Sequence, residues 1–571
     1  MNDATHIWPA MTLAEAEARL TARGEPFETV DAVIRGVPMK VWKNVPATAR
    51  AVFELARRHG GREFLVYEDE RITFEAFARA ALAVAAALER EGLAKGDRVA
   101  LAMRNLPEWP VIFFGALLAG GIVVPLNAWW TGTELAYGLR DSGSRFLFAD
   151  PERQERLKGT LPAAVQKQFV TRAASRPAGV AALEDILGPP GHWSALPDGV
   201  PPDVAPDPED DATIFYTSGT TGAPKGAVGT HRALTTNIFA TPFSTARNAL
   251  RRGAAPPDPR AAPQRVSLVA VPFFHVTGAI AALVPNMAAG GKLVLMRKFE
   301  PEAAMALIHK ERVTVTGGVP AIALALLEHP RFAEYDLSSL RMLHYGGAPS
   351  PVTLAARIRA ALPQAAPGNG WGMTETSATC TTHFGEEYGH RPASCGPALP
   401  VSPIRIMDGA GECERPRGQV GELWASGPNL VRGYWNRPDD TRAAFRDGWL
   451  RTGDLATMDD EGFCFIVDRA RDMLIRGGEN IYCIEVESVL CEHPAVADAA
   501  LVGLHHPLLG EVPAAIVQAR GPVSESDLRG FAATRMAAFK VPDRIVVSHK
   551  PLPRNTTGKL VKSALKSLYF P

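Results

Sequence analysis

Two kinds of apolar pattern alternate through the first two thirds of the chain. The stretch 74–90 is Ala-rich and repeats its apolar positions with the period of a helix that packs on one face, whereas 98–103 has the pattern of a short strand. After Arg469 the segments become shorter and long buried runs disappear. The pattern therefore predicts an α/β chain that ends in a small α+β domain.

One uncharged run has the length of a membrane span. Trp109–Thr133 carries no charged residue over a length that could cross a bilayer, but prolines and glycines interrupt it. We interpret it as a buried helix at 111–118, a Gly120-Gly121 turn and a buried strand at 122–126, as in a doubly wound sheet. A transmembrane helix is the less favoured alternative.

Two segments have the composition of surface connections. Residues 161–211 are rich in Pro, Ala, Gly and Asp, which predicts a connection with some local structure. For 246–264 we predict a solvated loop, with contact to phosphates or anionic lipid as the alternative. This second segment contains Arg247, Arg251, Arg252 and Arg260.

Length and composition limit the class of protein. The 571 residues exceed one ordinary domain, and an apolar share of 46% is typical of folded globular chains. Lys and Arg number 61, as do Asp and Glu, so no global charge points to nucleic acid, and we expect peripheral membrane contact at most. The six cysteines form no C-x-x-C pair and the N-terminus has no signal-peptide pattern, which together favour reduced thiols and a cytoplasmic location.

The clearest chemical signal is a loop rich in Gly, Ser and Thr. Residues 216–226 read Tyr-Thr-Ser-Gly-Thr-Thr-Gly-Ala-Pro-Lys-Gly and follow a predicted strand at 212–215. Backbone N–H groups and hydroxyls of such a loop can point at oxyanions, and Lys225 adds a cation, as polyphosphate binding requires. The loop is not a Walker A motif, because Gly219 and Gly222 are only three positions apart.

This loop resembles the phosphate-binding signature of the adenylate-forming superfamily, which comprises acyl-CoA synthetases, nonribosomal peptide adenylation domains and firefly luciferase. Further segments match the superfamily in the same order along the chain. The resemblance implies a large N-terminal domain at 1–468, built of doubly wound sheets with a small barrel-like subdomain. It also implies a mobile C-terminal lid domain at 469–571, with Arg471 as the hinge.

The resemblance assigns an ATP site to several distant segments. The segment 370–376 is similar to one whose aromatic ring stacks on adenine, whose Thr contacts the α-phosphate and whose Glu holds Mg²⁺ with a loop hydroxyl, here Thr217. Asp454 and Arg469 match residues that reach the ribose. The implied nucleotide-binding residues are Thr217, Ser218, Gly219, Thr220, Thr221, Gly222, Lys225, Gly347, Ala348, Asn369, Gly370, Trp371, Gly372, Thr374, Asp454, Arg469 and Lys559.

Two C-terminal segments complete the implied chemistry. Lys559 resembles the family lysine that bridges the attacking carboxylate and the α-phosphate, because a Pro-Arg frame and a Gly precede it. Gly477, Gly478 and Glu479 resemble a Gly-rich stretch that lines the tunnel for CoA.

The segment 272–278, Pro-Phe-Phe-His-Val-Thr-Gly, resembles the acyl-pocket entrance of acyl-CoA synthetases. Amino-acid-activating relatives place an Asp in this region and this chain does not, which favours an acid with an uncharged tail. We predict that His275 forms a wall between the acyl and thiol tunnels. The predicted pocket residues are His275, Val276, Thr277, Gly317, Gly318 and Tyr345.

The implied activity is that of an ATP-dependent acyl-CoA synthetase. A fatty or aryl carboxylate displaces pyrophosphate to give an acyl-adenylate, and CoA then displaces AMP, so the cofactors would be ATP, Mg²⁺ and CoA. Loading of a separate acyl carrier protein and a non-catalytic nucleotide-binding protein remain the alternatives, and the assembly state stays open, a homodimer included. The predicted catalytic residues are Lys559, Thr374, Glu375 and His275, with Thr217 and Glu375 as metal ligands.

Overall fold

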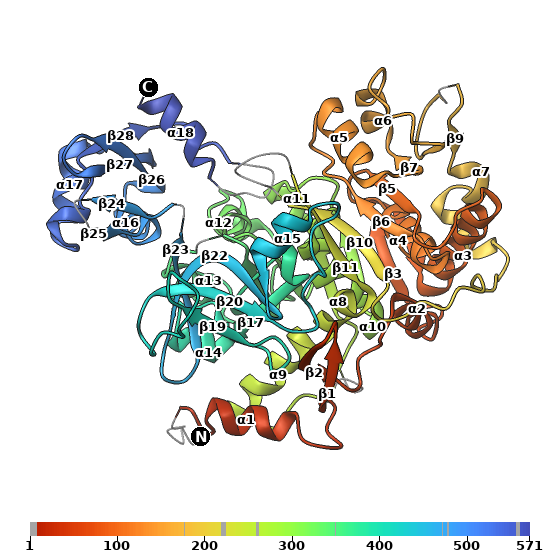
Figure 1. Cartoon of the computed structure of the whole chain (residues 1–571), viewed down its shortest axis with the longest axis horizontal. Coiled ribbons are helices and arrows are strands. Elements are labelled where there is room, and N and C mark those ends of the chain that lie inside the picture. Colours follow the sequence, from red (N-terminus) through yellow and green to blue (C-terminus); the bar gives the residue numbers. More distant parts are fainter. Residues whose placement is uncertain are drawn as a thin grey trace.

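The computed structural model describes residues 8–175, 178–217, 224–258, 262–348, 350–470, 472–476, 479–554 and 560–570. Its elements form a large N-terminal body and a smaller C-terminal body, which lies to one side in blue (Figure 1). Three larger sheets build the first body and one builds the second.

The first sheet has seven strands in the order β11-β10-β6-β5-β7-β8-β9. Neighbouring strands are parallel except β11, which pairs antiparallel with β10, so the predicted phosphate loop joins these two strands. The strands are β5 (Arg98–Ala102), β6 (Ile122–Pro125), β7 (Phe146–Ala149), β8 (Lys167–Val170), β9 (Ala181–Ala182), β10 (Asp211–Tyr216) and β11 (Gly226–Thr230).

The second sheet has eight strands in the order β17-β16-β15-β14-β12-β13-β3-β4. The six inner strands are parallel, and the edge strands β17 and β4 are antiparallel to their neighbours. The strands are β3 (Glu63–Tyr67), β4 (Glu70–Thr73), β12 (Val266–Val269), β13 (Lys292–Leu295), β14 (Val315–Gly318), β15 (Met342–Gly346), β16 (Ala366–Met373) and β17 (Ala378–Phe384).

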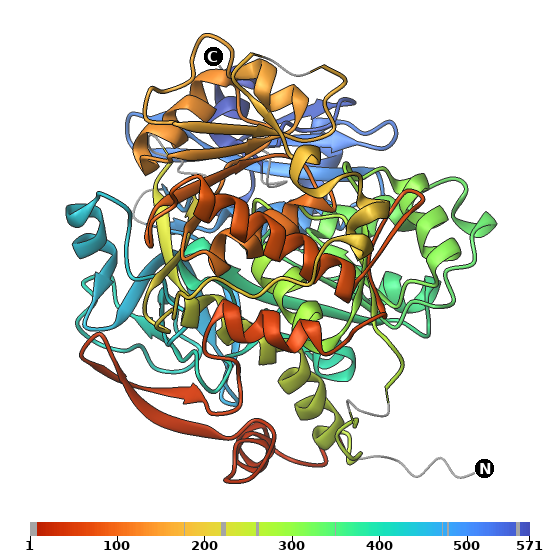
Figure 2. The same ribbon diagram turned by 90° about the vertical axis from the view of Figure 1, so that its right-hand side faces the viewer.

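The largest core lies between these two sheets. It unites apolar side chains of β3 and β5 with those of helices α2 (Ala49–Arg57), α3 (Phe74–Arg90), α4 (Glu108–Leu118) and α10 (Val284–Ala289). The ribbons of α2 and α3, coloured red to orange, cross the middle of the view in Figure 2. Thr73 caps α3 by accepting a hydrogen bond from Ala76 N at 3.1 Å. The predicted helix at 74–90 is therefore confirmed at both ends.

Other helices cover the outer faces of the two sheets. Leu135 and Leu139 of α5 pack on the first sheet, and Ile308 of α11 packs on the second. The helices of this body also include α5 (Gly132–Ser142), α6 (Pro151–Arg156), α7 (Glu184–Leu187), α8 (His231–Thr236), α11 (Pro301–Glu311), α12 (Pro320–Leu327), α13 (Leu354–Ala361), α14 (Gly385–His390) and α15 (Pro438–Ala444).

The uncharged run 109–133 forms α4, a turn and β6, close to the predicted bounds. A Cβ added at Gly115 of α4 would lie 2.8 Å from Val84 Cβ of α3, so this glycine lets the two helices pack closely. Among the described residues, no helix is both long and apolar enough to cross a membrane.

A third sheet is antiparallel and closes the large body. Its order is β18-β23-β22-β20-β19, with β21 on β22. The strands are β18 (Gly396–Pro397), β19 (Ile404–Met407), β20 (Gly421–Ser426), β21 (Phe445–Arg446), β22 (Trp449–Met458) and β23 (Phe463–Arg469). At the N-terminus stand α1 (Leu13–Leu20) and a hairpin of β1 (Thr29–Ile34) and β2 (Val37–Trp42).

The C-terminal body is α+β, as predicted. Its sheet has the order β25-β24-β27-β26, with β28 on β27, and sheet membership changes between Arg469 and Leu474. Its elements are β24 (Leu474–Arg476), β25 (Glu479–Ile481), α16 (Cys483–Cys491), β26 (Val496–His506), β27 (Gly510–Ala519), α17 (Glu525–Ala533), β28 (Arg544–Ser548) and α18 (Lys562–Tyr569).

The prediction of a solvated loop at 246–264 is wrong for its first part. Residues up to Arg251 belong to helix α9 (Ala240–Arg251), and the side chains of Arg247 and Arg251 are fully buried. Arg247 Nη2 lies 3.0 Å from Glu387 Oε2, and Arg251 Nη1 lies 2.6 Å from Glu461 Oε1. These arginines pack inside because distant carboxylates neutralise them.

Candidate functional site

Four neighbouring parallel strands end at one sheet edge, and predicted site residues follow them. β12, β14, β15 and β16 lie side by side, with Gly346 in register with Gly370. His275 comes shortly after β12 and Thr374 directly after β16. Because α/β sheets bind ligands at the carboxyl ends of their strands, this strand order brings together segments that are far apart in the sequence.

The predicted adenine and ribose residues contact one another. The Trp371 indole donates a hydrogen bond from Nε1 to Asp454 Oδ2 at 2.8 Å, and Arg469 Nε lies 3.5 Å from Oδ1 of the same carboxylate. β22 and β23 place Asp454 opposite Arg469. The arrangement fixes a hydrogen-bond acceptor for hydroxyl groups beside an aromatic ring.

The predicted metal ligand Glu375 lies next to the predicted loop cation. Its side chain is buried, and Tyr434 donates its hydroxyl to Glu375 Oε1 at 2.8 Å. Lys225 Nζ lies 5.3 Å from the centre of the Tyr434 ring and 2.6 Å from Asp440 Oδ1. Burial, and then the Glu375 carboxylate, raise the pKa of Tyr434, so its phenol keeps the proton that it donates. Sequence reasoning missed Tyr434, which lies 59 residues from Glu375.

A strained turn follows the predicted phosphate contact. Thr374–Thr376 form a short 3₁₀ turn, η5, and Ser377 and Ala378 then have φ values of 46° and 84°. The Asn237 side chain donates to Ser377 O at 2.7 Å and accepts from Thr379 N at 2.9 Å. Left-handed conformations are costly for residues other than glycine and concentrate at functional sites. Asn237, which sequence reasoning also missed, holds this turn in place.

Close strand packing explains two of the predicted glycines in the described part of the chain. A Cβ at Gly372 would lie 1.6 Å from Ala378 O, and one at Gly317 would lie 1.8 Å from His344 O. Gly347 differs, because it has φ of +72° and nothing lies within 4 Å of its Cβ position. Open space for a ligand is thus found at Gly347, whereas the other two glycines are required by the backbone alone.

His275 lies among aromatic side chains. Its ring centre is 4.7 Å from that of Phe274 and 6.2 Å from that of Trp129, which follows β6. A π-helical segment, η3 (Thr277–Leu283), follows directly, and such segments are rare and often occur at functional sites. The aromatic surroundings suit an apolar ligand, and Trp129 was not predicted from the sequence.

Tyr345, a predicted pocket residue, packs into the interior of the large body, and its role in the acyl pocket stays a prediction. Its side chain is buried in the core on the outer side of the second sheet, and its hydroxyl lies 2.9 Å from that of Tyr388. Side chains alternate between the faces of a strand, and Tyr345 falls on the face that α13 covers. Of the other predicted pocket residues, Val276 is buried and Thr277 is exposed.

Several predicted residues fall outside the described part of the chain. Other predicted residues are described. Thr217 donates its backbone N–H to Lys225 O at 2.9 Å, and the Asn369 side-chain amide donates to Ser394 O at 3.0 Å. Glu479 is exposed on β25. The roles of the undescribed residues stay predictions. They are Ser218, Gly219, Thr220, Thr221, Gly222, Arg471, Gly477, Gly478 and Lys559.

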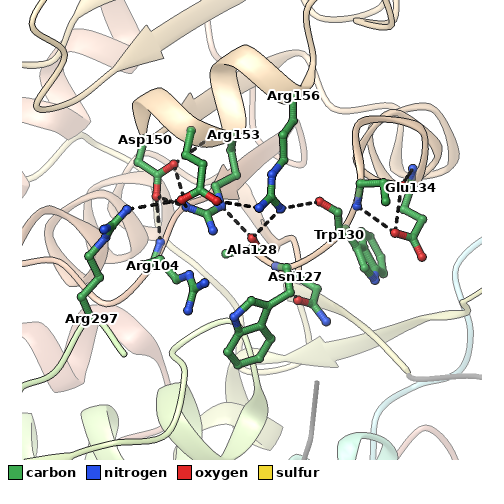
Figure 3. Close-up of polar contacts among 12 residues, drawn as sticks. Arg104, Asn127, Ala128, Trp130, Glu134, Asp150, Arg153, Arg156 and Arg297 are labelled. Carbon is green, nitrogen blue, oxygen red and sulfur yellow. Dashed lines mark hydrogen bonds and ion pairs between the residues drawn. The ribbon is translucent and has the colours of Figure 1, made fainter. Parts of the chain in front are cut away.

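An arginine-rich cluster supports the loop after β6. From α6, Arg153 donates Nε to Ala128 O at 2.6 Å and pairs with Asp150 at 2.9 Å, while Arg156 donates to Trp130 O at 2.8 Å (Figure 3). These bonds fix the backbone on both sides of the tryptophan that faces the predicted acyl entrance. The cluster was not predicted, because each arginine alone resembles a surface charge.

A cavity of about 390 Å³ opens beside this loop. Arg104, Arg297 and Lys298 contribute three cations to its lining, together with two carboxylates. The guanidinium carbon of Arg104 lies 5.0 Å from the centre of the Trp129 ring. Arg104 thus connects the cavity to Trp129, whose ring lies near that of His275.

Comparisons with known proteins agree with this geometry. Residues 52–435 match the family described as AMP-binding enzyme, and residues 485–559 match the AMP-binding enzyme C-terminal domain. The chain belongs to this family, the adenylate-forming enzymes, which confirms the predicted family, the predicted α/β fold and the class of AMP-forming acid–thiol ligases.

Individual relatives cover nearly the whole chain. A feruloyl-CoA synthase of Amycolatopsis sp is 35% identical over 520 residues, 90% of this chain and 95% of that protein. A long-chain-fatty-acid–CoA ligase of Mycobacterium tuberculosis is 34% identical over 504 residues, 88% of this chain and 94% of that protein. The solved o-succinylbenzoate–CoA synthetase of Bacillus subtilis, in complex with its acyl-adenylate, has a TM-score of 0.74 at 30% identity and covers 90% of this chain and 97% of its own.

Proposed function

We propose that the protein is an ATP-dependent acyl-CoA synthetase that acts on a carboxylic acid with an uncharged tail. The observation that carries the proposal is the contact of Asp454 with both Trp371 and Arg469. The Asp454 carboxylate accepts a hydrogen bond from the Trp371 indole and lies next to the Arg469 guanidinium. This set unites the segments that the motifs assign to adenine and ribose.

The first half-reaction needs positive charge rather than an enzyme nucleophile. A carboxylate oxygen attacks the α-phosphorus of ATP, the bond to the bridging oxygen breaks, and pyrophosphate leaves with the negative charge. Lys225, Arg469 and Lys559 are the cations that we assign to this charge. Since Lys225 already pairs with Asp440 at 2.6 Å, the triphosphate would compete with that carboxylate.

The residues present fit magnesium. Glu375 offers a buried carboxylate that Tyr434 orients, and Thr217 offers a hydroxyl, both hard oxygen ligands of the kind that Mg²⁺ takes. When bound, the ion would neutralise charge on the pyrophosphate. A relative of this chain, the B. subtilis o-succinylbenzoate–CoA synthetase, has been solved with ATP and a magnesium ion.

In the second half-reaction the thiol sulfur of CoA attacks the acyl carbon, and AMP leaves with the electron pair of the broken C–O bond. The lining of the cavity holds the three cations Arg104, Arg297 and Lys298 and two carboxylates, so one net positive charge can face the phosphates of CoA. Arg104 also contacts the Trp129 ring, whose centre lies 6.2 Å from that of His275, a residue of the predicted acyl entrance. This charge supports CoA as the acceptor.

The acid is tested with a panel of fatty acids, benzoates, cinnamates and steroid carboxylates, each supplied with ATP, Mg²⁺ and CoA. We expect acid-dependent release of pyrophosphate and AMP and an acyl-CoA product. A purified acyl carrier protein in place of CoA tests the alternative acceptor. Absence of pyrophosphate release across the whole panel would contradict the proposal and support a non-catalytic nucleotide-binding protein.

Lys559→Ala should impair only the first half-reaction. The substitution removes one cation from the developing charge, so we expect adenylation to slow about 10²-fold or more. Thioester formation from supplied acyl-adenylate should continue at the wild-type rate. The two half-reactions are measured separately as pyrophosphate release and acyl-CoA formation, and an equal loss in both would contradict the assignment of Lys559 to adenylation.

A further inference from the structure

The two ends of the segment that carries Lys559 are joined. Arg554 and Leu560 form an antiparallel bridge, and Val561 N donates to Pro553 O at 3.2 Å. Lys559 directly precedes Leu560 in the sequence. The bridge and the hydrogen bond therefore form a closed base on either side of the segment 555–559.

An ion pair follows the base on its C-terminal side. Lys562, the first residue of α18, places Nζ 2.8 Å from Glu487 Oε1, and both side chains are largely buried. Glu487 stands on α16, and its Oε1 also accepts a hydrogen bond from Leu501 N of β26 at 2.8 Å. The hydrogen bond from β26 therefore fixes the Glu487 carboxylate independently of Lys562, which makes Glu487 a rigid anchor for the lysine.

Further charged groups at the junction of the two bodies face the same lysine. Cys483 N, at the start of α16, donates to the Asp468 carboxylate at the end of the large body, and Cys483 Sγ donates to Asp472 O at 2.9 Å. Burial on its own would lower the pKa of Lys562, but Glu487 and its neighbours offset burial and raise it, so the ammonium stays charged. Cys483, for which the motifs give no role, packs beneath this cluster.

The pair on the other side of the base is more open to solvent. Arg554 Nη2 lies 2.5 Å from Asp498 Oδ2, and the two side chains are 33% and 22% exposed, against 20% and 12% for Lys562 and Glu487. Exposed pairs contribute little to rigidity, whereas a desolvated pair is costly to break. Lys562 is therefore the stronger of the two anchors.

We propose that Lys562 is a positioning residue for adenylation: its ion pair with Glu487 fixes the base of the segment that presents Lys559 to the reacting groups. The proposal rests on the proposed function, because it takes the role of Lys559 from there. Lys562 itself touches no substrate and acts through Lys559.

The test compares Lys562→Met with Lys566→Met. Lys566 is exposed one turn further along α18, so its substitution removes a charge from the same helix without touching the cluster. We expect Lys562→Met to slow adenylation at least tenfold while acyl-CoA formation from supplied acyl-adenylate changes less than about twofold. Lys562→Arg should restore most of the rate, because a guanidinium can still pair with Glu487, and Lys566→Met should match the wild type.

A double-mutant cycle separates positioning from a general structural effect. If Lys562 acts only through Lys559, Lys562→Met should add less than about twofold to the loss already caused by Lys559→Ala. Equal losses in both half-reactions, or full additivity with Lys559→Ala, would overturn the proposal.

A measurement without turnover keeps this proposal distinct from the proposed function. Amide hydrogen exchange of peptides covering 550–565 should become at least tenfold faster in Lys562→Met and remain unchanged in Lys566→Met. Unchanged exchange in both variants would overturn the positioning role even if the wild type is an active synthetase. If exchange is faster in Lys562→Met but the wild type activates no acid, the result would support the role of Lys562 as an anchor. It would contradict only the proposed function.

Discussion

Trp371 is fixed by its own hydrogen bond before any nucleotide arrives. The indole N–H donates to Asp454 at 2.8 Å, and only 8% of the residue is exposed. An aromatic ring held in this way loses little conformational freedom when a base stacks on it, and the same bond orients the carboxylate. One side chain thereby prepares both the stacking surface and the hydroxyl acceptor.

Trp371→Phe should weaken ATP binding while leaving the acid site intact. Phenylalanine keeps an aromatic face but cannot donate to Asp454, and a hydrogen bond to a charged group contributes about 1.5 to 3 kcal/mol. We expect KM for ATP to rise about tenfold, which corresponds to the lower part of that range. Steady-state kinetics of pyrophosphate release at saturating acid would measure the change.

Trp449→Phe is the matched control, because Trp449 is the first residue of β22, the strand that also carries Asp454. Its substitution should leave KM for ATP unchanged. An unchanged KM in Trp371→Phe, or an equal rise in both variants, would show that the bond to Asp454 does not prepare the nucleotide site.

Residues within short motifs could be predicted, and residues that support them from elsewhere could not. Trp371, Glu375 and Asp454 each stand in a recognisable local pattern. Tyr434 and Asn237 contact that site through side chains from loops and helices far away in the chain, and neither has a motif of its own. Their roles depend on the strand order, which no local pattern specifies.

Helices α3 and α9 show the same limit of prediction from local sequence. α3 was predicted at 74–90 because its apolar positions repeat locally, and in the structure Thr73 caps its start. The second half of α9, from residue 246, was predicted to be part of a solvated loop because its arginines resemble solvated charges. Their partner Glu387 lies 140 residues from Arg247, so the pairing that buries them is invisible in a local window.

Arg247→Met should destabilise the large body. Arg247 is fully buried, pairs with Glu387 at 3.0 Å and donates to Thr382 O at 2.7 Å, so the substitution leaves a buried carboxylate and a carbonyl without this partner. Breaking a buried ion pair from one side costs about 3 to 5 kcal/mol. We expect the unfolding transition in urea to move to lower concentration by a corresponding amount.

The neighbouring Arg252→Met serves as control, because Arg252 is exposed at the end of α9. Its substitution should shift the transition by less than about 0.5 kcal/mol. If Arg247→Met unfolds at the same urea concentration as Arg252→Met, the buried network does not stabilise α9.

At the scale of the whole molecule, strand order creates the site. β12 lies between β13 and β14 in the second sheet, although β13 follows β12 directly in the chain, and this places His275 beside the ends of β14 to β16. The alternation of helices and strands predicted a doubly wound sheet but not the order of its strands, because crossovers leave no periodic trace in the sequence. The motifs therefore predicted which residues belong to the site but not how the fold brings them together.

A buried histidine and a half-buried glutamate give the fold opposite responses to pH. Burial lowers the pKa of His231 to about 4, and its Nδ1 accepts a hydrogen bond from Ala49 N at 3.3 Å, as a neutral imidazole can. Burial also raises the pKa of Glu17 to about 7, although Arg247 acts against it. When the pH is below 6.5, the ordinary pKa of histidine, His231 takes up a proton as the chain unfolds. When the pH is above 4.5, the ordinary pKa of glutamate, Glu17 releases a proton as the chain unfolds.

His231→Gln should therefore reduce the acid sensitivity of the fold. Between pH 6.5 and 4 the unfolded chain binds one more proton at His231 than the folded chain, so this histidine lowers the free energy of unfolding by about 1.4 kcal/mol for each unit that the pH falls. Gln can still accept a hydrogen bond from Ala49 N and does not titrate. The difference in the free energy of unfolding between the wild type and the variant should therefore change by about 1.4 kcal/mol for each pH unit. Urea titrations at a series of pH values would measure it. Glu17→Gln should show the opposite sign between pH 4.5 and 7, because the folded wild type keeps a proton that the unfolded chain loses. Parallel pH profiles for the wild type and His231→Gln would mean that His231 is not held neutral by burial.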